Sequence, residues 1–325
     1  MLNEIKTFLG QDWRDAEDLV RSSLSSDIEL LDKTNEAILS TSGKRLRPLI
    51  SLLVARACSG GKATRDSICC AAASELLHNA TLLHDDVADG STERRGVPTV
   101  MSILGGPASV LLGDYWLVKA VGVILSSTKG DTIVRIFAKT LSDLAEGEML
   151  QLQKASCCDT AEEDYFRIIY SKTASLFEAA GTSAAISVDA PEEFVEAVRE
   201  YTVSLGIAFQ IRDDMLDYSD SKLTGKPSGI DLDEQKITLP LLGALSAVPG
   251  ERADEMRRKL MEIHDKPEIK EEIRAFVLSN GGMEYSVSVL EDYVGKAVKA
   301  LDVLPDSEEK DYLVKIAEFT AVRDR

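Results

Sequence analysis

The sequence lacks a continuous apolar run long enough to act as a signal peptide or to cross a membrane. Its opening segment, MLNEIKTFLGQDWRDAEDLV, alternates charged and apolar residues and contains no unbroken apolar core. The longest apolar candidate, residues 110–125, is interrupted by Asp114 and Lys119. We therefore expect a protein with no integral membrane segment.

Cysteine is scarce, and its spacing excludes the usual cysteine-based frameworks. The five cysteines are an odd number, and no pair of them has the CxxC spacing of a zinc or redox site. This pattern favours reduced thiols and therefore a cytoplasmic location. The cysteines are Cys58, Cys69, Cys70, Cys157 and Cys158.

Domain linkers are also missing. The length of 325 residues alone would suggest about two domains, but no Gly/Ser-rich or Pro-rich segment and no change of composition marks a boundary. We therefore expect one domain over residues 1–325.

Basic residues are outnumbered by acidic ones. The sequence has 37 Lys and Arg against 55 Asp and Glu, which gives a formal net charge of −18. Such a charge argues against nucleic acid and anionic membranes as partners, because both repel an acidic protein. A phosphate-bearing ligand would have to be bound by local basic residues and by metal ions.

Strand-like alternation of apolar and polar residues is absent, whereas helical periodicity is nearly continuous. Apolar residues recur at i, i+3, i+4 and i+7, which predicts an all-α protein. Residues 71–83 and 173–188 are small or apolar on nearly every side, so we expect both segments to be buried central helices. The predicted helices lie near residues 25–40, 45–58, 65–88, 106–127, 129–153, 161–187, 191–218, 237–247, 251–264, 267–279, 281–303 and 307–320.

The sequence does contain one aspartate pattern in two copies, DDVAD at residues 85–89 and DDMLD at residues 213–217. On a helix, positions i and i+4 lie on one face about 6 Å apart, so the outer aspartates of each copy form a carboxylate pair. Clustered carboxylates repel one another unless a cation joins them, and oxygen-only ligands favour Mg²⁺. The alternative, a solvated acidic helix face, fits a single copy better than two. The predicted metal ligands are Asp85, Asp86, Asp89, Asp213, Asp214 and Asp217.

Basic residues accompany each copy. Arg94 and Arg95 follow the first copy, and Lys226 follows the second. These cations could simply balance the aspartates, but the forked donors of arginine also match phosphate oxygens. Two adjacent arginines, moreover, repel unless a polyanion joins them. Carboxylate, metal, diphosphate and arginine would form a stack of alternating charge.

With these elements in place, the sequence resembles the trans-prenyltransferases, that is, the polyprenyl (isoprenoid) diphosphate synthases. The resemblance covers nearly the whole chain in the order of that family. Besides both aspartate copies, its elements are GKRLRP at 43–48, His78, Arg94-Arg95-Gly96, Gly113-Asp114-Tyr115, Gly147-Glu148 with Gln151, Lys172-Thr173, Phe209-Gln210, the segment from Gly225-Lys226-Pro227 to Asp231, Lys236 and VRDR at 322–325.

The resemblance implies a single-domain helical bundle of the isoprenoid synthase type around a central cavity, and a homodimer. It implies a prenyltransferase that uses an allylic diphosphate, isopentenyl diphosphate and three Mg²⁺ ions. The allylic substrate ionises, the double bond of isopentenyl diphosphate attacks, and a proton is lost. Metal ions and cations stabilise the negative charge that develops on the leaving diphosphate.

The resemblance also implies roles for individual residues. It places Asp85, Asp89 and Asp213 on the metal ions, and Asp86, Asp214 and Asp217 in support or on metal-bound water. Arg94, Lys172, Lys226 and Lys236 would contact the allylic diphosphate, and Lys44, Arg47, His78 and Arg95 would bind isopentenyl diphosphate. Thr173 and Gln210 would stabilise cationic carbon with their oxygen dipoles. One departure concerns Lys236, since Glu234-Gln235-Lys236 stands where the family has Glu-Gly-Lys.

Product length is expected to depend on the helix that carries the first copy. The fifth and fourth residues before Asp85 are Ala80 and Thr81, where short-chain members of the family have an aromatic residue, and Leu77 lies one turn below. This pattern favours the long-chain branch, whose products serve as quinone side chains. A farnesyl or geranylgeranyl diphosphate synthase and a non-catalytic subunit of a heteromeric synthase remain as alternatives.

Other residues keep two interpretations. His84, beside the first copy, could orient a metal ligand or serve a structural role. Gly113-Asp114-Tyr115 is more typical of packing with a hydrogen bond than of catalysis. A class I terpene cyclase would also have an aspartate-rich motif, but its second metal site follows an Asn/Ser/Glu pattern that this sequence replaces with DDMLD.

Overall fold

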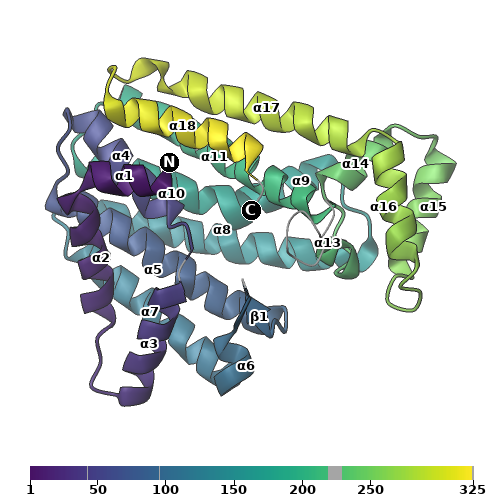
Figure 1. Ribbon diagram of the computed structural model, residues 1–325, viewed down its shortest axis with the longest axis horizontal. Coiled ribbons are helices and arrows are strands. Elements are labelled where there is room, and N and C mark those ends of the chain that lie inside the picture. Colours follow the sequence, from purple (N-terminus) through teal and green to yellow (C-terminus); the bar gives the residue numbers. More distant parts are fainter. Residues whose placement is uncertain (42, 95, 219–228, 324–325) are drawn as a thin grey trace. The chain divides into compact units, whose positions relative to one another are not determined.

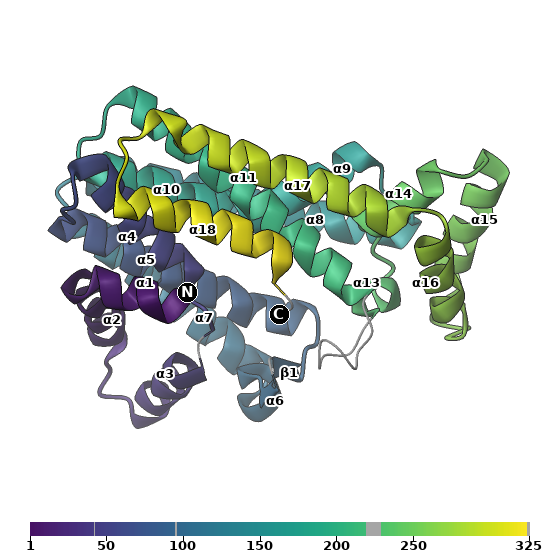
Figure 2. The ribbon, with the colours of Figure 1, turned by 45° about the horizontal axis from the view of Figure 1, so that its top comes forward.

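The computed structural model describes residues 1–41, 43–94, 96–218 and 229–323, and its regular structure is almost entirely helical (Figures 1 and 2). Within these residues the sheet is a single short hairpin, in which β1 (Glu93–Arg94) pairs antiparallel with β2 (Val97–Pro98). The all-α class predicted from the periodicity is confirmed.

The chain divides into two compact units, each built from several segments. The first contains Met1–Ala138, Ala179–Val198 and Val303–Leu313, and the second contains Lys139–Glu178, Arg199–Asp302 and Val314–Arg325. The division falls within α8 (Gly130–Cys157), α10 (Ser175–Ser187), α11 (Glu192–Asp217) and α18 (Glu308–Val322). The expectation of one domain over residues 1–325 stays a prediction.

The first unit is organised around α5 (Arg65–Ala88). Every residue of α5 from Ile68 to Leu77 is buried, because α4 and α7 pack along it. Figures 1 and 2 both show α7 side by side with α5. The other elements of this unit are α1 (Leu2–Leu9), α2 (Gln11–Leu24), α3 (Glu29–Thr41), α4 (Leu46–Ser59), α6 (Val100–Leu104) and α7 (Gly106–Leu125).

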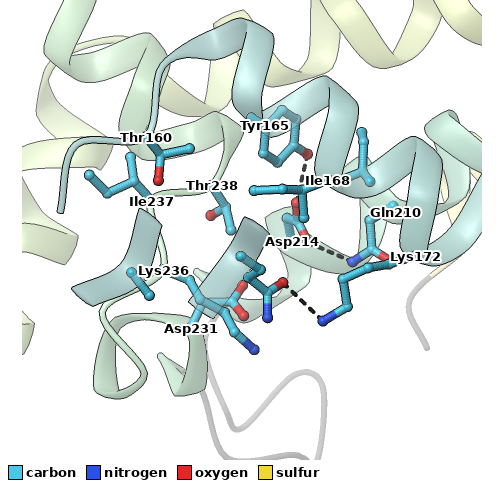
Figure 3. Close-up of a pocket in the computed structure, with 13 residues that line it drawn as sticks. Thr160, Tyr165, Ile168, Lys172, Gln210, Asp214, Asp231, Lys236, Ile237 and Thr238 are labelled. Carbon is cyan, nitrogen blue, oxygen red and sulfur yellow. Dashed lines mark hydrogen bonds between the residues drawn. The ribbon is translucent and has the colours of Figure 1, made fainter. Parts of the chain in front are cut away.

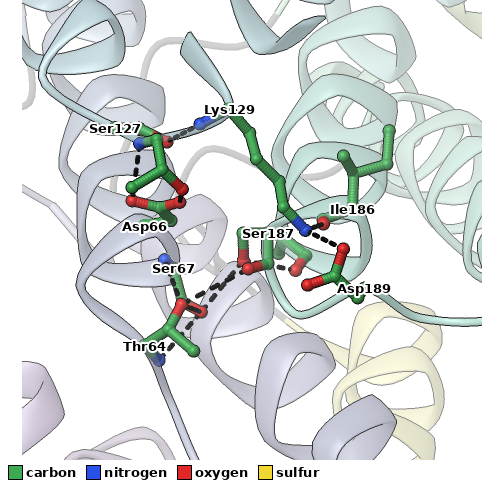
Figure 4. A network of polar contacts seen from close by, with 10 residues as sticks. Thr64, Asp66, Ser67, Ser127, Lys129, Ile186, Ser187 and Asp189 are labelled. Carbon is green, nitrogen blue, oxygen red and sulfur yellow. Dashed lines mark hydrogen bonds and ion pairs between the residues drawn. The ribbon is translucent and has the colours of Figure 1, made fainter.

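A polar network anchors the N-terminal end of α5 (Figure 4). Thr64 and Ser67 form a capping box, each side chain accepting the backbone N–H of the other at 3.1 Å. The Ser67 hydroxyl also lies 2.9 Å from the hydroxyl of Ser187 at the end of α10. Lys129 donates to the carbonyl of Ile186 at 2.7 Å. These bonds hold the start of the helix whose other end carries the first aspartate copy.

Apart from Asp114 and Lys119, helix α7 is largely apolar, but it is not fully buried. Among the described residues it is the one helix whose length and mean hydropathy would allow it to cross a membrane, a test that core helices of soluble proteins also pass. Leu111, Val118 and Leu125 are exposed on its surface.

The second unit has its own apolar core. In that core α14 packs against α16 and α17, and Ile211, Leu239 and Ile273 are fully buried. The elements that belong to this unit are α9 (Glu162–Ile169), the π-helical turn η1 (Tyr170–Ala174), α13 (Ile230–Asp233), α14 (Leu239–Ser246), α15 (Gly250–Met261), α16 (Ile269–Ser279) and α17 (Gly282–Ala300), and η2 (Leu301–Val303) follows at its boundary.

Two glycines allow neighbouring helices to approach the π turn η1 closely. A Cβ atom on Gly147 of α8 would lie 2.5 Å from the Cβ of Ser171, and one on Gly206 of α11 would lie 2.5 Å from the Cα of Ala174. Both separations are too short for any side chain. A π turn redirects the side chains that follow it, and such turns often occur at functional sites. Here the turn contains Lys172 and Thr173.

Candidate active site

The first aspartate cluster lies at the C-terminal end of α5. Asp85 is partly exposed and Asp89 is exposed, and the backbone N–H of Asp89 donates to the carbonyl of Asp85 at 2.8 Å. The two side chains are thus one turn apart on the same face. The C-terminal end of a helix carries partial negative charge, so carboxylates there are unfavourable unless cations are bound. This arrangement agrees with the predicted carboxylate pair.

Asp86 is directed into the protein rather than toward a ligand. It is buried, and its Oδ1 accepts a hydrogen bond from Nε of Arg94 at 2.8 Å. Arg94 belongs to β1, so this ion pair attaches the hairpin to the end of α5. Arg95, predicted to bind isopentenyl diphosphate, lies outside the described residues.

His84 packs against α7. Its Nε2 atom lies 3.2 Å from Oδ1 of Asp114 and 3.3 Å from the carbonyl oxygen of Val110. A Cβ on Gly113 would lie 2.4 Å from the same Nε2, so only glycine leaves room for the ring. These contacts favour the structural interpretation of His84. Gly113 leaves space for its ring, and Asp114 contacts its Nε2 atom.

The second aspartate cluster lies at the C-terminal end of α11, and its first member is held by an arginine. Asp213 Oδ1 accepts a hydrogen bond from Nη2 of Arg323 at 2.8 Å. Arg323 follows α18, is 4 % exposed, and places its guanidinium 3.8 Å from the ring centre of Phe209. The Asp213 side chain is 38 % exposed, which leaves it accessible to a metal ion.

The other two aspartates of this cluster are engaged inside the unit. Asp214 accepts hydrogen bonds from the Tyr165 hydroxyl at 2.6 Å and from the Gln210 amide at 2.8 Å. Asp217 accepts the backbone N–H groups of Ile230 at 3.1 Å and Asp231 at 3.0 Å, and so caps α13. These carboxylates organise the scaffold around Asp213.

Several buried carboxyl groups make this corner of the unit electrostatically unfavourable. Burial raises the pKa of Asp214 to about 7, although the hydrogen bonds from Tyr165 and Gln210 oppose the shift. Burial and the nearby Asp214 raise the pKa of Asp231 well above its ordinary value. Strongly perturbed pKa values cluster at functional sites, so these acids mark this corner as a candidate site.

A pocket of about 180 Å³ opens beside this cluster (Figure 3). Four predicted site residues line it, namely Lys172, Gln210, Asp214 and Lys236. The Thr173 hydroxyl donates to Oε1 of Gln210 at 2.7 Å, so the two groups predicted to stabilise cationic carbon are in contact.

The two lysines of this pocket have acidic partners. Lys172 Nζ lies 2.5 Å from Oε2 of Glu148 and donates to Oε1 of Gln151 at 3.0 Å. Lys236 forms an ion pair with Glu234. Lys236 thus lines the pocket although Gln235 replaces the expected glycine, and Gln235 itself adopts a positive φ of 57°. Lys226 lies outside the described residues.

The remaining predicted residues belong to α4, α5 and the segment before α4. Lys44, Arg47 and His78 are all partly buried. Of the predicted chain-length residues, Ala80 and Leu77 are each 1 % exposed, whereas Thr81 is partly exposed.

The donor sets fit divalent cations that are shared with a substrate. Among the described residues, no group of three or more His, Cys, Asp or Glu side chains could hold a metal ion without other ligands. Mg²⁺ usually keeps several waters and takes one or two carboxylates plus substrate phosphates. The solvent-accessible carboxylates of Asp85, Asp89 and Asp213 match that requirement.

Two residues that contact the second aspartate cluster were not predicted to do so. Tyr165 belongs to no motif, and its contact with Asp214 spans 49 residues of sequence, so no local pattern reveals it. Arg323 belongs to the VRDR segment that the resemblance included, but its contact with Asp213 across 110 residues depends on the fold.

Comparison with known proteins identifies the family. A family model described as "Polyprenyl synthetase" matches residues 28–277. The octaprenyl diphosphate synthase of Haemophilus influenzae is 38% identical over 326 residues, which cover 99% of this chain and 97% of that protein. The crystal structure of a decaprenyl diphosphate synthase from Rhodobacter capsulatus superposes with a TM-score of 0.92 at 33% identity and covers 100% of both chains.

A second crystal structure carries ligands. It is a polyprenyl synthase from Caulobacter crescentus CB15 complexed with calcium and isoprenyl diphosphate, with a TM-score of 0.90 and 33% identity, covering 100% of this chain and 98% of that one. The long match to the family model and the full-length relatives agree with the aspartate clusters at the ends of α5 and α11. The chain belongs to the polyprenyl synthetase family and is a prenyltransferase.

Proposed function

We propose that the protein is a long-chain trans-polyprenyl diphosphate synthase, which adds isopentenyl diphosphate units to an allylic diphosphate. The observation that carries the proposal is the pair of carboxylate clusters at the C-terminal ends of α5 and α11, where cations are required. The long-chain assignment is supported by the small residues Ala80 and Thr81 on α5 and by the octaprenyl and decaprenyl synthases among the relatives.

The chemistry that bound divalent cations supply is neutralisation of the charge on the leaving diphosphate. Asp85, Asp89 and Asp213 would hold these ions, and we propose three Mg²⁺. Asp86, Asp214 and Asp217 would keep the surrounding backbone and side chains in place through the bonds described above.

Two sets of basic residues would each bind one of the two diphosphate substrates. Lys172 and Lys236 line the pocket and would contact the allylic diphosphate, as would Arg94 once the substrate competes with Asp86. Lys44, Arg47 and His78 would bind isopentenyl diphosphate. Thr173 and Gln210 would direct oxygen lone pairs toward the cationic carbon, which costs little reorganisation because they are already hydrogen-bonded.

The proposal extends to assembly and location. The exposed apolar residues of α7 would be covered by a second copy of the chain in a homodimer. The reduced-thiol pattern supports a cytoplasmic location: the structure leaves all five cysteines unpaired.

One incubation tests the activity and the product length together. Purified protein is supplied with Mg²⁺, labelled isopentenyl diphosphate and a panel of allylic primers, and the dephosphorylated products are separated by length. We expect products longer than geranylgeranyl. Products that end at farnesyl or geranylgeranyl would support the short-chain alternative. No incorporation with any primer would contradict the proposal and favour a non-catalytic subunit.

The metal assignment has its own test. Asp85→Ala or Asp89→Ala should lower turnover by about 10²-fold or more, because a divalent charge at the leaving group is lost or misplaced. Asp306→Ala is the matched control, since that side chain is fully exposed and forms an ion pair with Lys310 on the next turn. Near-normal turnover of either α5 variant at saturating Mg²⁺ would refute the assignment.

A further inference from the structure

A hydrogen-bonded chain of four side chains crosses the second unit from α9 to the π turn. The Tyr165 hydroxyl donates to Oδ2 of Asp214 at 2.6 Å, and the Gln210 amide nitrogen donates to Oδ1 of the same carboxylate at 2.8 Å. The Thr173 hydroxyl donates to Oε1 of Gln210 at 2.7 Å. Figure 3 shows Tyr165, Asp214 and Gln210 joined by these bonds at the pocket.

The direction of these hydrogen bonds is fixed at the carboxylate. Both oxygens of Asp214 accept hydrogen bonds here, so the amide of Gln210 turns its NH₂ group toward Asp214 and its oxygen toward Thr173. The Thr173 hydroxyl then donates its hydrogen bond to Gln210. The lone pairs of the threonine oxygen can therefore face an electron-poor carbon. If the amide turned over, its NH₂ group would donate to Thr173 and occupy those lone pairs.

We infer that Tyr165 is a positioning residue for prenyl transfer: by holding Asp214 it fixes the amide of Gln210, and through that amide the orientation of the Thr173 hydroxyl. This inference rests on the proposed function, in which Gln210 and Thr173 stabilise cationic carbon. Tyr165 holds the carboxylate through one short bond, while its ring is buried edge-on against Phe166 at 5.4 Å between ring centres. The ring therefore fixes where the hydroxyl stands.

The burial of Asp214 makes this control necessary. The side chain is within a few per cent of complete burial, so water cannot replace a missing donor at low cost. Without the Tyr165 hydroxyl, one carboxylate oxygen loses its donor and the carboxylate gains freedom to rotate, so it no longer holds the amide of Gln210 in one orientation.

The first experiment compares two tyrosine variants of the full chain. Tyr165→Phe removes one hydroxyl and keeps the ring. Tyr285→Phe is the matched control, because the Tyr285 hydroxyl also donates to a carboxylate on α9, that of Glu162 at 2.8 Å, but not at the pocket. We expect kcat to fall about tenfold in Tyr165→Phe with little change in KM for either diphosphate, and to stay within about twofold in Tyr285→Phe.

A double-variant cycle shows whether Tyr165 acts through Gln210. If it does, Tyr165→Phe should lower kcat about tenfold in the wild-type background but less than about twofold in the Gln210→Ala background. Equal losses in both backgrounds would overturn the inference, because a general structural effect does not depend on the amide. Wild-type kcat in Tyr165→Phe would overturn it as well.

The outcomes separate this inference from the proposed function. If Gln210→Ala itself keeps wild-type kcat, the role of Gln210 in the proposed function fails and the inference fails with it. If Gln210→Ala loses activity and Tyr165→Phe does not, the inference alone fails. Thermal unfolding accompanies each assay. Should Tyr165→Phe unfold at the assay temperature, Asp214→Asn takes its place in the same cycle, with the same two outcomes.

Discussion

Within each aspartate cluster the middle residue is buried, while at least one outer residue remains accessible. Asp86 pairs with Arg94, and Asp214 accepts hydrogen bonds from Tyr165 and Gln210. The repeated sequence pattern thus combines carboxylates that are accessible to a metal ion with a carboxylate that fixes the local structure. The sequence predicts both clusters because the i, i+4 spacing is local, but it cannot predict which oxygen atoms are already occupied, since their donors come from distant segments.

At the residue scale, Arg323 tests whether the contacts that support Asp213 matter for metal binding. Its Nη2 atom donates to Asp213 and to the carbonyl of Phe209, both at 2.8 Å. Hydrogen bonds to charged groups contribute about 1.5–3 kcal/mol, so Arg323→Ala should lower the free energy of unfolding by about that amount. It should also raise the Mg²⁺ concentration needed for half-maximal turnover, because Asp213 loses its support.

Arg257→Ala provides the control for Arg323→Ala. Arg257 donates to the backbone carbonyls of Cys158 at 3.1 Å and Thr160 at 3.4 Å, and it contacts no aspartate of the cluster in these bonds. Its loss should lower stability, measured by urea unfolding, without changing the Mg²⁺ requirement. An unchanged Mg²⁺ requirement in Arg323→Ala would show that Arg323 has no influence on the metal site.

At the scale of elements, helix boundaries follow the sequence where periodicity and capping agree. The predicted helix at 65–88 matches α5 (Arg65–Ala88), and that at 191–218 matches α11 (Glu192–Asp217). The predicted helix at 161–187 is instead divided by the π turn, which depends on the close approach of α8 and α11. The helices α1 and α2 were not predicted, although their buried residues, Ile5 and Leu9 in α1 and Trp13, Ala16, Val20 and Leu24 in α2, recur at helical spacing.

The close packing around the π turn can be tested at the two glycines of α8 and α11 that contact it. Gly147→Ala or Gly206→Ala should lower the free energy of unfolding by about 1–3 kcal/mol, because the added Cβ overlaps with Ser171 or with the backbone of Ala174. Gly295→Ala, in an open position of α17, should be neutral or stabilise by about 0.5–1 kcal/mol. Equal stability of all three variants in chemical unfolding would show that η1 is not closely packed.

Helix α5 also carries the predicted chain-length residues. Ala80→Phe should shorten the product toward farnesyl or geranylgeranyl length, because an aromatic ring adds a large rigid volume about one and a half turns below Asp85. The first condensation should be largely preserved, since the aspartates are unchanged. Chromatography of the dephosphorylated products measures the effect. The same length distribution from wild type and variant would show that Ala80 does not line the path of the growing chain.

At the scale of the whole molecule, the exposed apolar surface of α7 is expected to pack against a partner. Leu111, Val118 and Leu125 of α7 are 70%, 67% and 54% exposed and recur every seven residues, and Ile103 of the neighbouring α6 is 67% exposed. A soluble chain rarely leaves an apolar stripe of this length in water, and a repeat of seven residues suits a helix that packs along another helix. A second copy of α7 across a twofold axis would present the same stripe in return.

We therefore expect the purified protein to stay in solution without detergent and to elute at twice its chain mass of 35.4 kDa. The double variant Leu111→Glu with Val118→Glu should elute at the mass of one chain, because two buried charges on each copy would face the same charges on its partner. Leu278→Glu, on the exposed side of α16, should leave the mass unchanged. Light scattering after size-exclusion chromatography measures the mass of all three proteins.

A monomeric wild type, or a double variant that keeps twice the chain mass, would show that the stripe on α7 is not the dimer interface. A wild type that requires detergent would instead assign the apolar surface of α7 to a membrane.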